Sequence, residues 1–597
     1  MHWTKSIAAC AMALTLGLSA TTARGQAAQS NSENLKDWWK NAVIYEIYPR
    51  SYQDSNGDGV GDLNGITQRL DYLKTLGVDA IWLSPIYPSP QVDFGYDISD
   101  YENIDPQYGT LQDFDRLVAE AKQRNIRIIM DMVMNHSSDK HKWFIESRSS
   151  KDNPYRDWYI WHDGKGQTAK SPGEPPNNWQ SDFGHSAWEW DPKTRQYWYH
   201  KFYIQQPDFN WNNPKVHEAF KDILKFWLDR GVAGFRFDAI TTLFEDPQMR
   251  DDEVLKDKNG QSYKNVYGDV ALNDTMTDNL PGVHPVMQEM RQVADQYKPD
   301  VFPGTRIFIG ETYMPNIAEL AKQYGTAEHP EFQLPMDTQV GFINKLDVPT
   351  FRERLNDVET KIGDNVPLLV FDNHDNQRLD ARYGDSLHNE GIQRVIATIL
   401  FTSRAASLFY YGDEIGMKTT PPERKEDVKD PVGLTGWPRD KGRDGERTPM
   451  QWDATTNAGF SNGTPWLPVP PTFTTVNVKA EDSDPHSILA WYQSLIQLKK
   501  QNGVLANGTN VMLDMENKNV LSWMRQAEGA PPIVIAVNFT AEAQTVNLTG
   551  GSAGLKPGPV RTMFKSPGGA VPASLDHIDL GAFGVYIGQV EEAGTRD

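Results

Sequence analysis

The chain has 597 residues and a formal net charge of -21, because 80 Asp and Glu outnumber 59 Lys and Arg. A field of this sign repels phosphate groups, so it argues against nucleic acids and acidic membrane surfaces as partners. The length exceeds what a single hydrophobic core supports, so we expect two to four domains.

The N-terminus has the pattern of a secretory signal peptide, which we place at residues 1–27. Lys5 supplies the positive start, residues 7–19 form a short apolar run, and small residues follow up to Ala27. The apolar run is too short to span a membrane as a stable helix, and no later segment reaches ~18 apolar residues. We therefore expect an exported protein, periplasmic or secreted, that does not interact with a membrane. The one cysteine, Cys10, lies in the signal, which excludes disulfides and cysteine-bound zinc from the mature chain.

Strand-like and helix-like segments alternate along most of the chain, which predicts a parallel α/β sheet. The strand-like runs are residues 42–48, 80–83, 127–134, 234–237, 307–310, 332–336, 368–371 and 408–411. The helix-like segments are residues 66–76, 111–124, 216–230, 286–297, 391–403 and 486–500. Eight such strands predict a (β/α)8 TIM barrel, which carries its active site at the carboxyl ends of its strands.

Two long stretches interrupt this alternation, and a third region follows it. Residues 137–205 are too long for a barrel loop, so we expect a small inserted subdomain after strand 3, which divides the catalytic barrel into residues 38–136 and 206–505. Residues 418–473 are rich in Pro and charge and predict a long loop after the last strand. Short β runs separated by Gly and Pro predict a C-terminal antiparallel β-sandwich domain over residues 510–592.

Four of the predicted strands end in charged or polar residues. A carboxylate at the mouth of a barrel strand is costly unless it is paired or used. Any single one could form an ion pair that holds the top of the barrel together, but several that can converge there predict a catalytic site. The four ends are Asp131-Met-Val-Met-Asn135-His136, Gly234-Phe-Arg236-Phe-Asp238, Gly310-Glu311 and Phe371-Asp-Asn-His374-Asp375.

Asp238, Glu311 and Asp375 together suit the hydrolysis of a glycosidic bond. In that reaction one carboxylate attacks the anomeric carbon, and one carboxylic acid protonates the leaving oxygen. The acid needs a raised pKa, which burial or neighbouring carboxylates supply. The nucleophile must stay ionised, and Arg236 can assist because it lies two residues before Asp238 and points to the same side of the strand. The third carboxylate can stabilise a transition state that resembles an oxocarbenium ion.

The order of these motifs resembles that of glycoside hydrolase family 13, the α-amylase family, in its oligo-1,6-glucosidase and α-glucosidase branch. The resemblance runs from about Trp38 into the C-terminal domain. The run Gln206-Pro-Asp-Phe-Asn210 is similar to the Gln-Pro-Asp-Leu-Asn signature of the branch, with Phe209 in place of Leu. Arg447-Thr-Pro-Met-Gln-Trp452 is another run of this branch.

The resemblance implies a role for each member of the carboxylate trio. Asp238 is expected to be the nucleophile of a retaining double displacement, Glu311 the general acid/base, and Asp375 the stabiliser of the transition state. The substrate implied is a short α-glucoside.

The resemblance also implies the residues that bind the sugar. His136, Arg236 and His374 are expected to contact the sugar in the innermost subsite, and Tyr96 to form the platform under it. Asp93 and Arg447 match a pair that closes the subsite at the non-reducing glucose, which implies an exo-acting enzyme.

Residues 54–62 place oxygen ligands at alternate positions, a spacing that resembles an EF-hand calcium loop. The twelfth position is Gly65 instead of Glu, so a closing bidentate ligand is missing, and a turn without metal is the alternative. In the branch that the chain resembles, this loop binds Ca²⁺ or Mg²⁺, and we expect a structural ion that stabilises an exported chain without disulfides. The ligands implied are Asp54, Asn56, Asp58, the Val60 carbonyl and Asp62.

In this branch the residue after the nucleophile follows the linkage of the substrate: Val accompanies α-1,6 preference, and Ala or Thr accompanies α-1,4. The residue here is Ala239, so we expect α-1,4-linked substrates such as maltose. Sucrose isomerases and trehalose synthases share the machinery but pass the glucosyl group to a sugar. Isomerases carry an Arg-Leu-Asp-Arg-Asp-like loop, which Arg378-Leu-Asp-Ala-Arg382 resembles in part, so transglucosylation or isomerisation is an alternative.

A second alternative is a non-catalytic sugar-binding protein on the same fold, since fold does not imply function. The intact trio argues against it, because a binding protein would be free to lose those carboxylates.

Overall fold

The computed structural model describes residues 37–297, 304–549, 555 and 558–591. The predicted signal peptide at residues 1–27 lies outside the described residues. In the part of the chain that is described, no helix is both long and apolar enough to cross a membrane.

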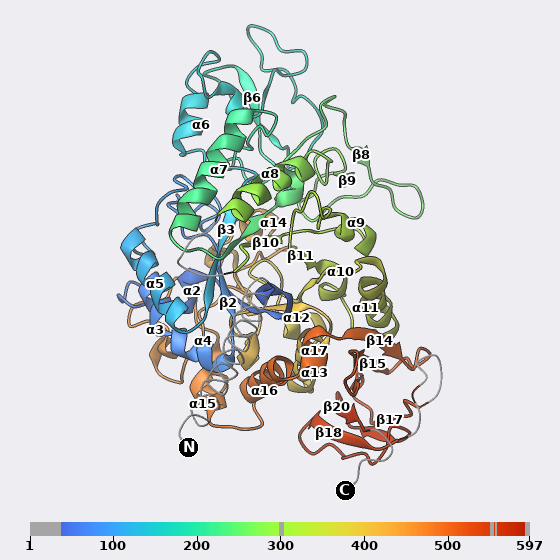
Figure 1. Cartoon of the computed structure of the whole chain (residues 1–597). Coiled ribbons are helices and arrows are strands. Elements are labelled where there is room, and N and C mark those ends of the chain that lie inside the picture. Colours follow the sequence, from blue (N-terminus) through green and yellow to red (C-terminus); the bar gives the residue numbers. More distant parts are fainter. Residues whose placement is uncertain (1–36, 298–303, 550–554, 556–557, 592–597) are drawn as a thin grey trace, which may run out of the picture.

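Eight parallel strands close into a barrel at the centre of the molecule, in the order β1-β13-β12-β11-β10-β7-β3-β2 (Figure 1). This confirms the predicted (β/α)8 architecture. The strands are buried on both faces, which explains why most of them appear in the sequence as continuous apolar runs. Their bounds are β1 Val43–Ile47, β2 Ala80–Leu83, β3 Arg127–Val133, β7 Gly234–Asp238, β10 Ile307–Gly310, β11 Leu334–Asp337, β12 Leu368–Val370 and β13 Ala406–Tyr410.

Helices cover the outside of the barrel. The predicted helix at residues 66–76 is two helices, because the backbone leaves the helical conformation at Arg69. The helix between β11 and β12 was not predicted, because its apolar face is narrow and the rest of its surface is charged. The bounds are α3 Leu63–Gln68, α4 Leu70–Leu76, α5 Leu111–Gln123, α7 Pro214–Asp229, α8 Val283–Gln296, α11 Val348–Lys361, α13 Asn389–Thr402 and α16 Ile488–Gln501.

The segment between β3 and α7 forms a small sheet of its own beyond the carboxyl ends of the barrel strands (Figure 1). Its strands are β4 (Trp161–His162), β6 (Gln196–Tyr199) and β5 (Trp188–Asp191), paired in that order. Buried aromatic side chains, including Trp179 and Trp188, give this inserted subdomain a separate core.

A second excursion leaves the barrel between β7 and α8 and was not predicted. Its strands are β8 (Glu253–Val254) and β9 (Leu272–Asn273). Strands of two residues are too short to show the alternation of apolar and polar residues by which a strand is predicted. The excursion packs against the inserted subdomain, where the Trp179 ring nitrogen donates to the Arg250 carbonyl at 2.9 Å. We call residues 243–282 the β7–α8 excursion.

Residues 418–473, after β13, contain only short helices such as α14 (Pro431–Gly436). The chain then forms the predicted antiparallel C-terminal region. One sheet has the order β14-β15-β16-β20-β18 and a second pairs β17 with β19. Their bounds are β14 Thr509–Leu513, β15 Val520–Gln526, β16 Ile533–Asn538, β17 Gln544–Val546, β18 Val560–Lys565, β19 Ile578–Leu580 and β20 Val585–Val590.

Candidate active site

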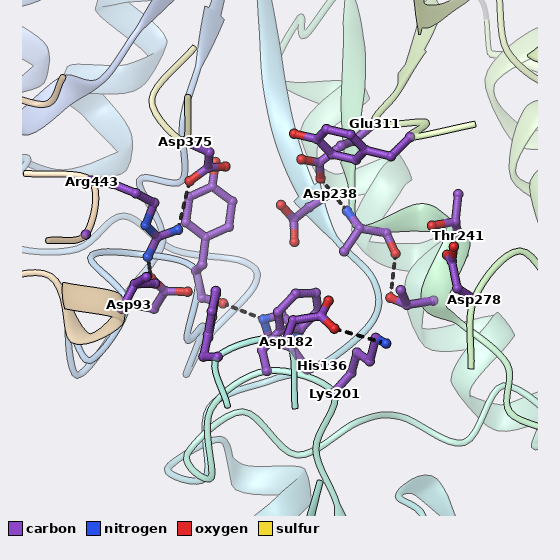
Figure 2. A pocket seen from close by; sticks show the side chains of 18 of the residues that line it. Asp93, His136, Asp182, Lys201, Asp238, Thr241, Asp278, Glu311, Asp375 and Arg443 are labelled. Atoms are coloured by element: carbon purple, nitrogen blue, oxygen red, sulfur yellow. Dashed lines mark hydrogen bonds and ion pairs between the residues drawn. The ribbon is translucent and has the colours of Figure 1, made fainter. Parts of the chain in front are cut away.

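The carboxyl ends of the barrel strands open into a cavity of about 510 Å³. Strand ends form its floor, and the inserted subdomain, the β7–α8 excursion and the loop after β13 form its walls (Figure 2). Six of the residues predicted from the sequence line it: Asp93, Tyr96, His136, Asp238, Glu311 and Asp375.

A buried arginine of β7 lies at the centre of the carboxylates. Arg236 has no exposed surface, and its Nη1 donates to Asp238 Oδ1 at 2.6 Å and to Asp131 Oδ2 at 3.0 Å. Its Nη2 lies 2.8 Å from Glu311 Oε2. A buried cation is costly unless it is paired, and here three carboxylates pair with it.

Asp238 and Glu311 differ in how they meet this arginine. Burial raises the pKa of each to about 7. Asp238 accepts a direct hydrogen bond from Arg236, which favours its ionised form. Glu311 Oε2 accepts a hydrogen bond from the Ala239 backbone N–H at 2.7 Å. The contact between Glu311 Oε2 and Arg236 Nη2 does not have the geometry of a hydrogen bond. Glu311 is therefore the better placed of the two to hold a proton.

Asp375 is held ionised. Although burial raises its pKa, His374, Arg443 and Arg447 outweigh that effect and keep it well below the usual value. His374 Nε2 lies 3.1 Å from Asp375 Oδ2, and both arginines approach Oδ1 to 2.8 Å.

His374 is a buried cation. Burial opposes its protonation, yet Asp375 and Glu46 raise its pKa to about 9. Its Nδ1 lies 2.5 Å from Glu46 Oε1, and its ring stacks between Tyr48 and Tyr96 with centroid distances of 5.7 and 5.3 Å. Sequence reasoning missed Glu46, because it lies inside the apolar run of β1.

His136 and Tyr96, which we predicted as sugar contacts, both line the cavity. Burial lowers the pKa of His136 to about 3, so it is neutral. Its Nε2 lies 3.2 Å from the Tyr96 carbonyl and 3.1 Å from Gln206 Nε2. The Tyr96 hydroxyl bonds His374 Nε2 at 2.7 Å and donates to Asp131 at 3.2 Å.

Arg236, His374 and Arg447 do not reach the cavity wall. We predicted the first two as sugar contacts, but all three have no exposed surface in this structure. They lie behind the carboxylates, because each one compensates charges that the barrel buries. Their effect is on the charge state and position of Asp238, Glu311 and Asp375.

The predicted pairing of Asp93 with Arg447 is wrong. Asp93 Oδ1 pairs with Arg443 Nη2 at 2.8 Å, and Arg443 also pairs with Asp375 at 2.8 Å (Figure 2). Arg443 pairs with Asp430 at 2.8 Å as well. Arg447, four residues later in the same loop, turns under the barrel mouth and donates to the His374 carbonyl at 2.7 Å. In the sequence, Arg443 could have been considered as the partner of Asp93 only because it is an arginine shortly before the Arg447 motif.

Other parts of the wall come from segments without a recognisable motif, so sequence reasoning missed them. They include Asp182, Phe183, Lys201, Phe202, Asp274, Asp278 and Tyr313.

The loop between β1 and α3 contains the predicted metal ligands. The side chains of Asp54, Asn56 and Asp58 each accept backbone N–H groups from further along the loop. Ser461 donates to Asp54 at 2.6 Å, and Asp62 caps the N-terminus of α3. The atoms predicted to bind the metal are all oxygens, which suits Ca²⁺ or Mg²⁺. Among the residues that the structure describes, no group of three or more His, Cys, Asp or Glu side chains has the arrangement of a metal site.

Comparison with known proteins finds relatives over most of the chain. The family model described as alpha amylase, catalytic domain, matches residues 46–508. The oligo-1,6-glucosidase of Parageobacillus thermoglucosidasius is 40% identical over 543 residues, which cover 86% of this chain and 92% of that protein. The probable alpha-glucosidase of Rhizobium meliloti is 37% identical over 567 residues, which cover 93% and 97%. The trehalulose synthase structure from Pseudomonas mesoacidophila MX-45 has a TM-score of 0.82 and 35% identity, and the match covers 93% of this chain and 99% of that one.

We predict that the protein loses stability between pH 6.5 and pH 9 and that Glu46→Gln reduces this loss. Because the pKa of His374 is raised from 6.5 to about 9, protonation of His374 stabilises the fold fully below pH 6.5, and this is lost as the pH rises through 9. A shift of this size corresponds to about 3 kcal/mol. Removing the Glu46 charge lowers the pKa of His374, so the pH range over which the protein loses stability becomes narrower and the loss smaller. The measurement is the Tm of both proteins at the two pH values.

The matched control for this prediction is Glu331→Gln. It removes the carboxylate that lies 2.7 Å from His284, away from the cavity, and should leave most of the pH dependence in place. Equal losses in the wild type and in Glu46→Gln would contradict a charged His374.

Proposed function

Since the chain belongs to glycoside hydrolase family 13, the α-amylase family, and is an α-glucosidase, we propose that it is a retaining, exo-acting enzyme. It would release glucose from the non-reducing end of short α-glucosides. The observation that carries this proposal is the convergence of Asp238, Glu311 and Asp375 on one cavity in different electrostatic environments.

The reaction has two displacements. Asp238 attacks the anomeric carbon while Glu311 gives its proton to the glycosidic oxygen, so the glycosidic bond breaks and a glucosyl ester forms on Asp238. Glu311, now a carboxylate, takes a proton from water, and the water oxygen displaces Asp238 to release glucose. Positive charge develops on the sugar ring in both transition states, and the ionised Asp375 stabilises it.

Exo action is supported by the closed end of the cavity. Arg443 joins Asp93, Asp375 and Asp430 there, so three carboxylates and one guanidinium form a continuous barrier. A bidentate or multidentate arginine is a rigid group that resists displacement. A single terminal glucose fits against such a barrier, whereas a longer chain would have to break it.

Hydrolysis is favoured over isomerisation by the positions of the two arginines in the Arg378–Arg382 run. Arg378 has no exposed surface and donates to the Tyr411 and Glu446 carbonyls at 2.8 and 3.0 Å. Arg382 donates to the Gly341 carbonyl at 2.6 Å. Neither side chain lines the cavity, so neither can hold a departing fructose in place for re-attack. Sucrose isomerisation remains the alternative function, because the trehalulose synthase shares the fold.

Preference for α-1,4 linkages is supported by Ala239. This residue lines the cavity next to the nucleophile, and its backbone N–H holds Glu311. In the branch that the chain resembles, Ala and Thr at this position accompany α-1,4 preference, whereas Val accompanies α-1,6 preference.

We also propose that the loop between β1 and α3 holds a structural Ca²⁺ or Mg²⁺ ion. The ion would neutralise the carboxylates of a loop that packs against Ser461, and it would take no part in the reaction. The ligands would be Asp54, Asn56, Asp58, the Val60 carbonyl and Asp62.

Asp238→Asn should lower the rate of glucose release by roughly 10⁴-fold or more, because no glucosyl ester can form. The measurement is the time course of products from maltose, isomaltose, sucrose and trehalose, resolved by chromatography, with circular dichroism to verify the fold. The anomeric form of the first glucose, read by NMR, should be α, as retention requires.

The matched control is Asp337→Asn. Asp337 is a buried carboxylate at the end of β11 that caps α10 (Thr338–Gly341) and does not line the cavity, and Asn is an equally good cap. A folded Asp238→Asn protein with undiminished turnover would refute the nucleophile, and β-glucose as the first product would refute retention. Trehalulose or isomaltulose formed from sucrose would favour the isomerase alternative.

For linkage, we expect Ala239→Val to shift the ratio of kcat/KM values for maltose and isomaltose toward isomaltose. Ala239 has a φ of 43°, so any β-branched residue is strained there and both rates should fall. Ala239→Thr is the isosteric control, with the same branching and strain, and should keep the ratio of the wild type. An unchanged ratio in both variants would show that this position does not select the linkage.

For the metal, EDTA should lower the Tm and added Ca²⁺ should restore it, because an ion bound only to the folded state stabilises it by about 2.7 kcal/mol at 100 times its Kd. Asp58→Ala should abolish both effects. Asp257→Ala is the control, since Asp257 accepts backbone N–H groups in a similar loop of the β7–α8 excursion. A wild-type Tm that EDTA does not change would overturn the metal proposal.

A further inference from the structure

The cavity has two sides with different charge. On one side Arg443 is paired with both Asp93 and Asp375, and Figure 2 shows the three residues together. On the other side, Lys201, Thr241 and Asp278 stand apart from these three residues in the same view. The polar residues of this side are Asp182, Lys201, Thr241, Asp274 and Asp278.

Lys201 is the cation of this second side. Its side chain is 1% exposed, and its Nζ lies 3.0 Å from Asp182 Oδ1 and 3.6 Å from Asp274 Oδ2. It also donates to Thr277 Oγ1 at 3.2 Å. Burial favours a neutral lysine, but Asp182 and Asp274 raise its pKa above the usual value, so Lys201 stays charged.

This ammonium group joins two segments that leave the barrel at different strands. Asp182 and Lys201 belong to the inserted subdomain between β3 and α7, whereas Asp274 and Thr277 belong to the β7–α8 excursion. Asp182 and Asp274 repel one another, so their positions on the wall depend on the charge between them. Lys201 therefore sets where both carboxylates stand.

The leaving sugar has to lie on this side. If the terminal glucose occupies the closed end at Asp93 and Arg443, as the proposed function requires, the glycosidic oxygen faces Glu311. The ring beyond that oxygen then extends toward the remaining wall of the same cavity. Carboxylates that face a sugar ring accept hydrogen bonds from its hydroxyl groups, and charged acceptors make the stronger bonds.

We propose that Lys201 is a positioning residue, which holds Asp182 and Asp274 as hydrogen-bond acceptors for the sugar ring that leaves in the first displacement and can return as an acceptor in the second. This inference rests on the proposed function. Three carboxylates against one ammonium group make this side acidic, so it selects a neutral sugar and disfavours a phosphorylated one.

The test compares two substrates that share the terminal glucose and differ in the leaving group. α-Glucosyl fluoride loses a fluoride ion, which does not contact the side of the cavity that carries Lys201. A disaccharide places its second ring against that side. In Lys201→Met, kcat/KM for the best disaccharide among maltose, isomaltose and sucrose should fall about tenfold further than kcat/KM for α-glucosyl fluoride. The side chain of Asp274 is 62% exposed and tolerates replacement. Asp274→Asn should therefore also lower the ratio of kcat/KM for the disaccharide to kcat/KM for α-glucosyl fluoride.

Lys165→Met is the matched control. Lys165 pairs with Asp251 at 3.5 Å and so joins the same two segments, but it is exposed and does not line the cavity. The ratio of kcat/KM for the disaccharide to kcat/KM for α-glucosyl fluoride in Lys165→Met should equal that of the wild type. Parallel losses on both substrates in Lys201→Met and an unchanged ratio in Asp274→Asn would overturn the inference, because they indicate only a structural role. A wild type without activity on either substrate would instead overturn the proposed function.

Discussion

Three carboxylates at the ends of neighbouring barrel strands depend on one buried cation, Arg236. Arg236 has no exposed surface, yet Asp131, Glu311 and Asp238 keep it charged. These carboxylates come from or directly follow β3, β10 and β7, three strands that are neighbours in the barrel. Each charge would be costly without the others, so the ends of these strands are held as one electrostatic unit.

A second group of cations acts on the remaining carboxylate. His374, Arg443 and Arg447 keep Asp375 ionised, whereas burial raises the pKa of Asp238 and Glu311. Carboxylates in one cavity thereby reach different charge states through their surroundings alone. Such a separation is what acid/base catalysis by chemically similar groups requires.

The barrel and the segments that leave it have different tasks. Strand ends supply the carboxylates that we propose as the reacting groups, because parallel strands direct their carboxyl ends to one face. The inserted subdomain, the β7–α8 excursion and the loop after β13 supply the walls, through residues such as Phe202, Asp278 and Arg443. Selection of a substrate can therefore change in these segments while the reaction stays the same.

The sequence by itself determined the barrel and the carboxylate trio. Buried strands, amphipathic helices and polar residues at strand ends are local patterns, and a local pattern is visible without the fold. The tertiary structure alone decided which distant groups meet. Glu46 reaches His374 across 328 residues only because the barrel closes. Arg443 and Arg447 share one loop, and the packing of that loop, which depends on the rest of the chain, decided which of them meets Asp93.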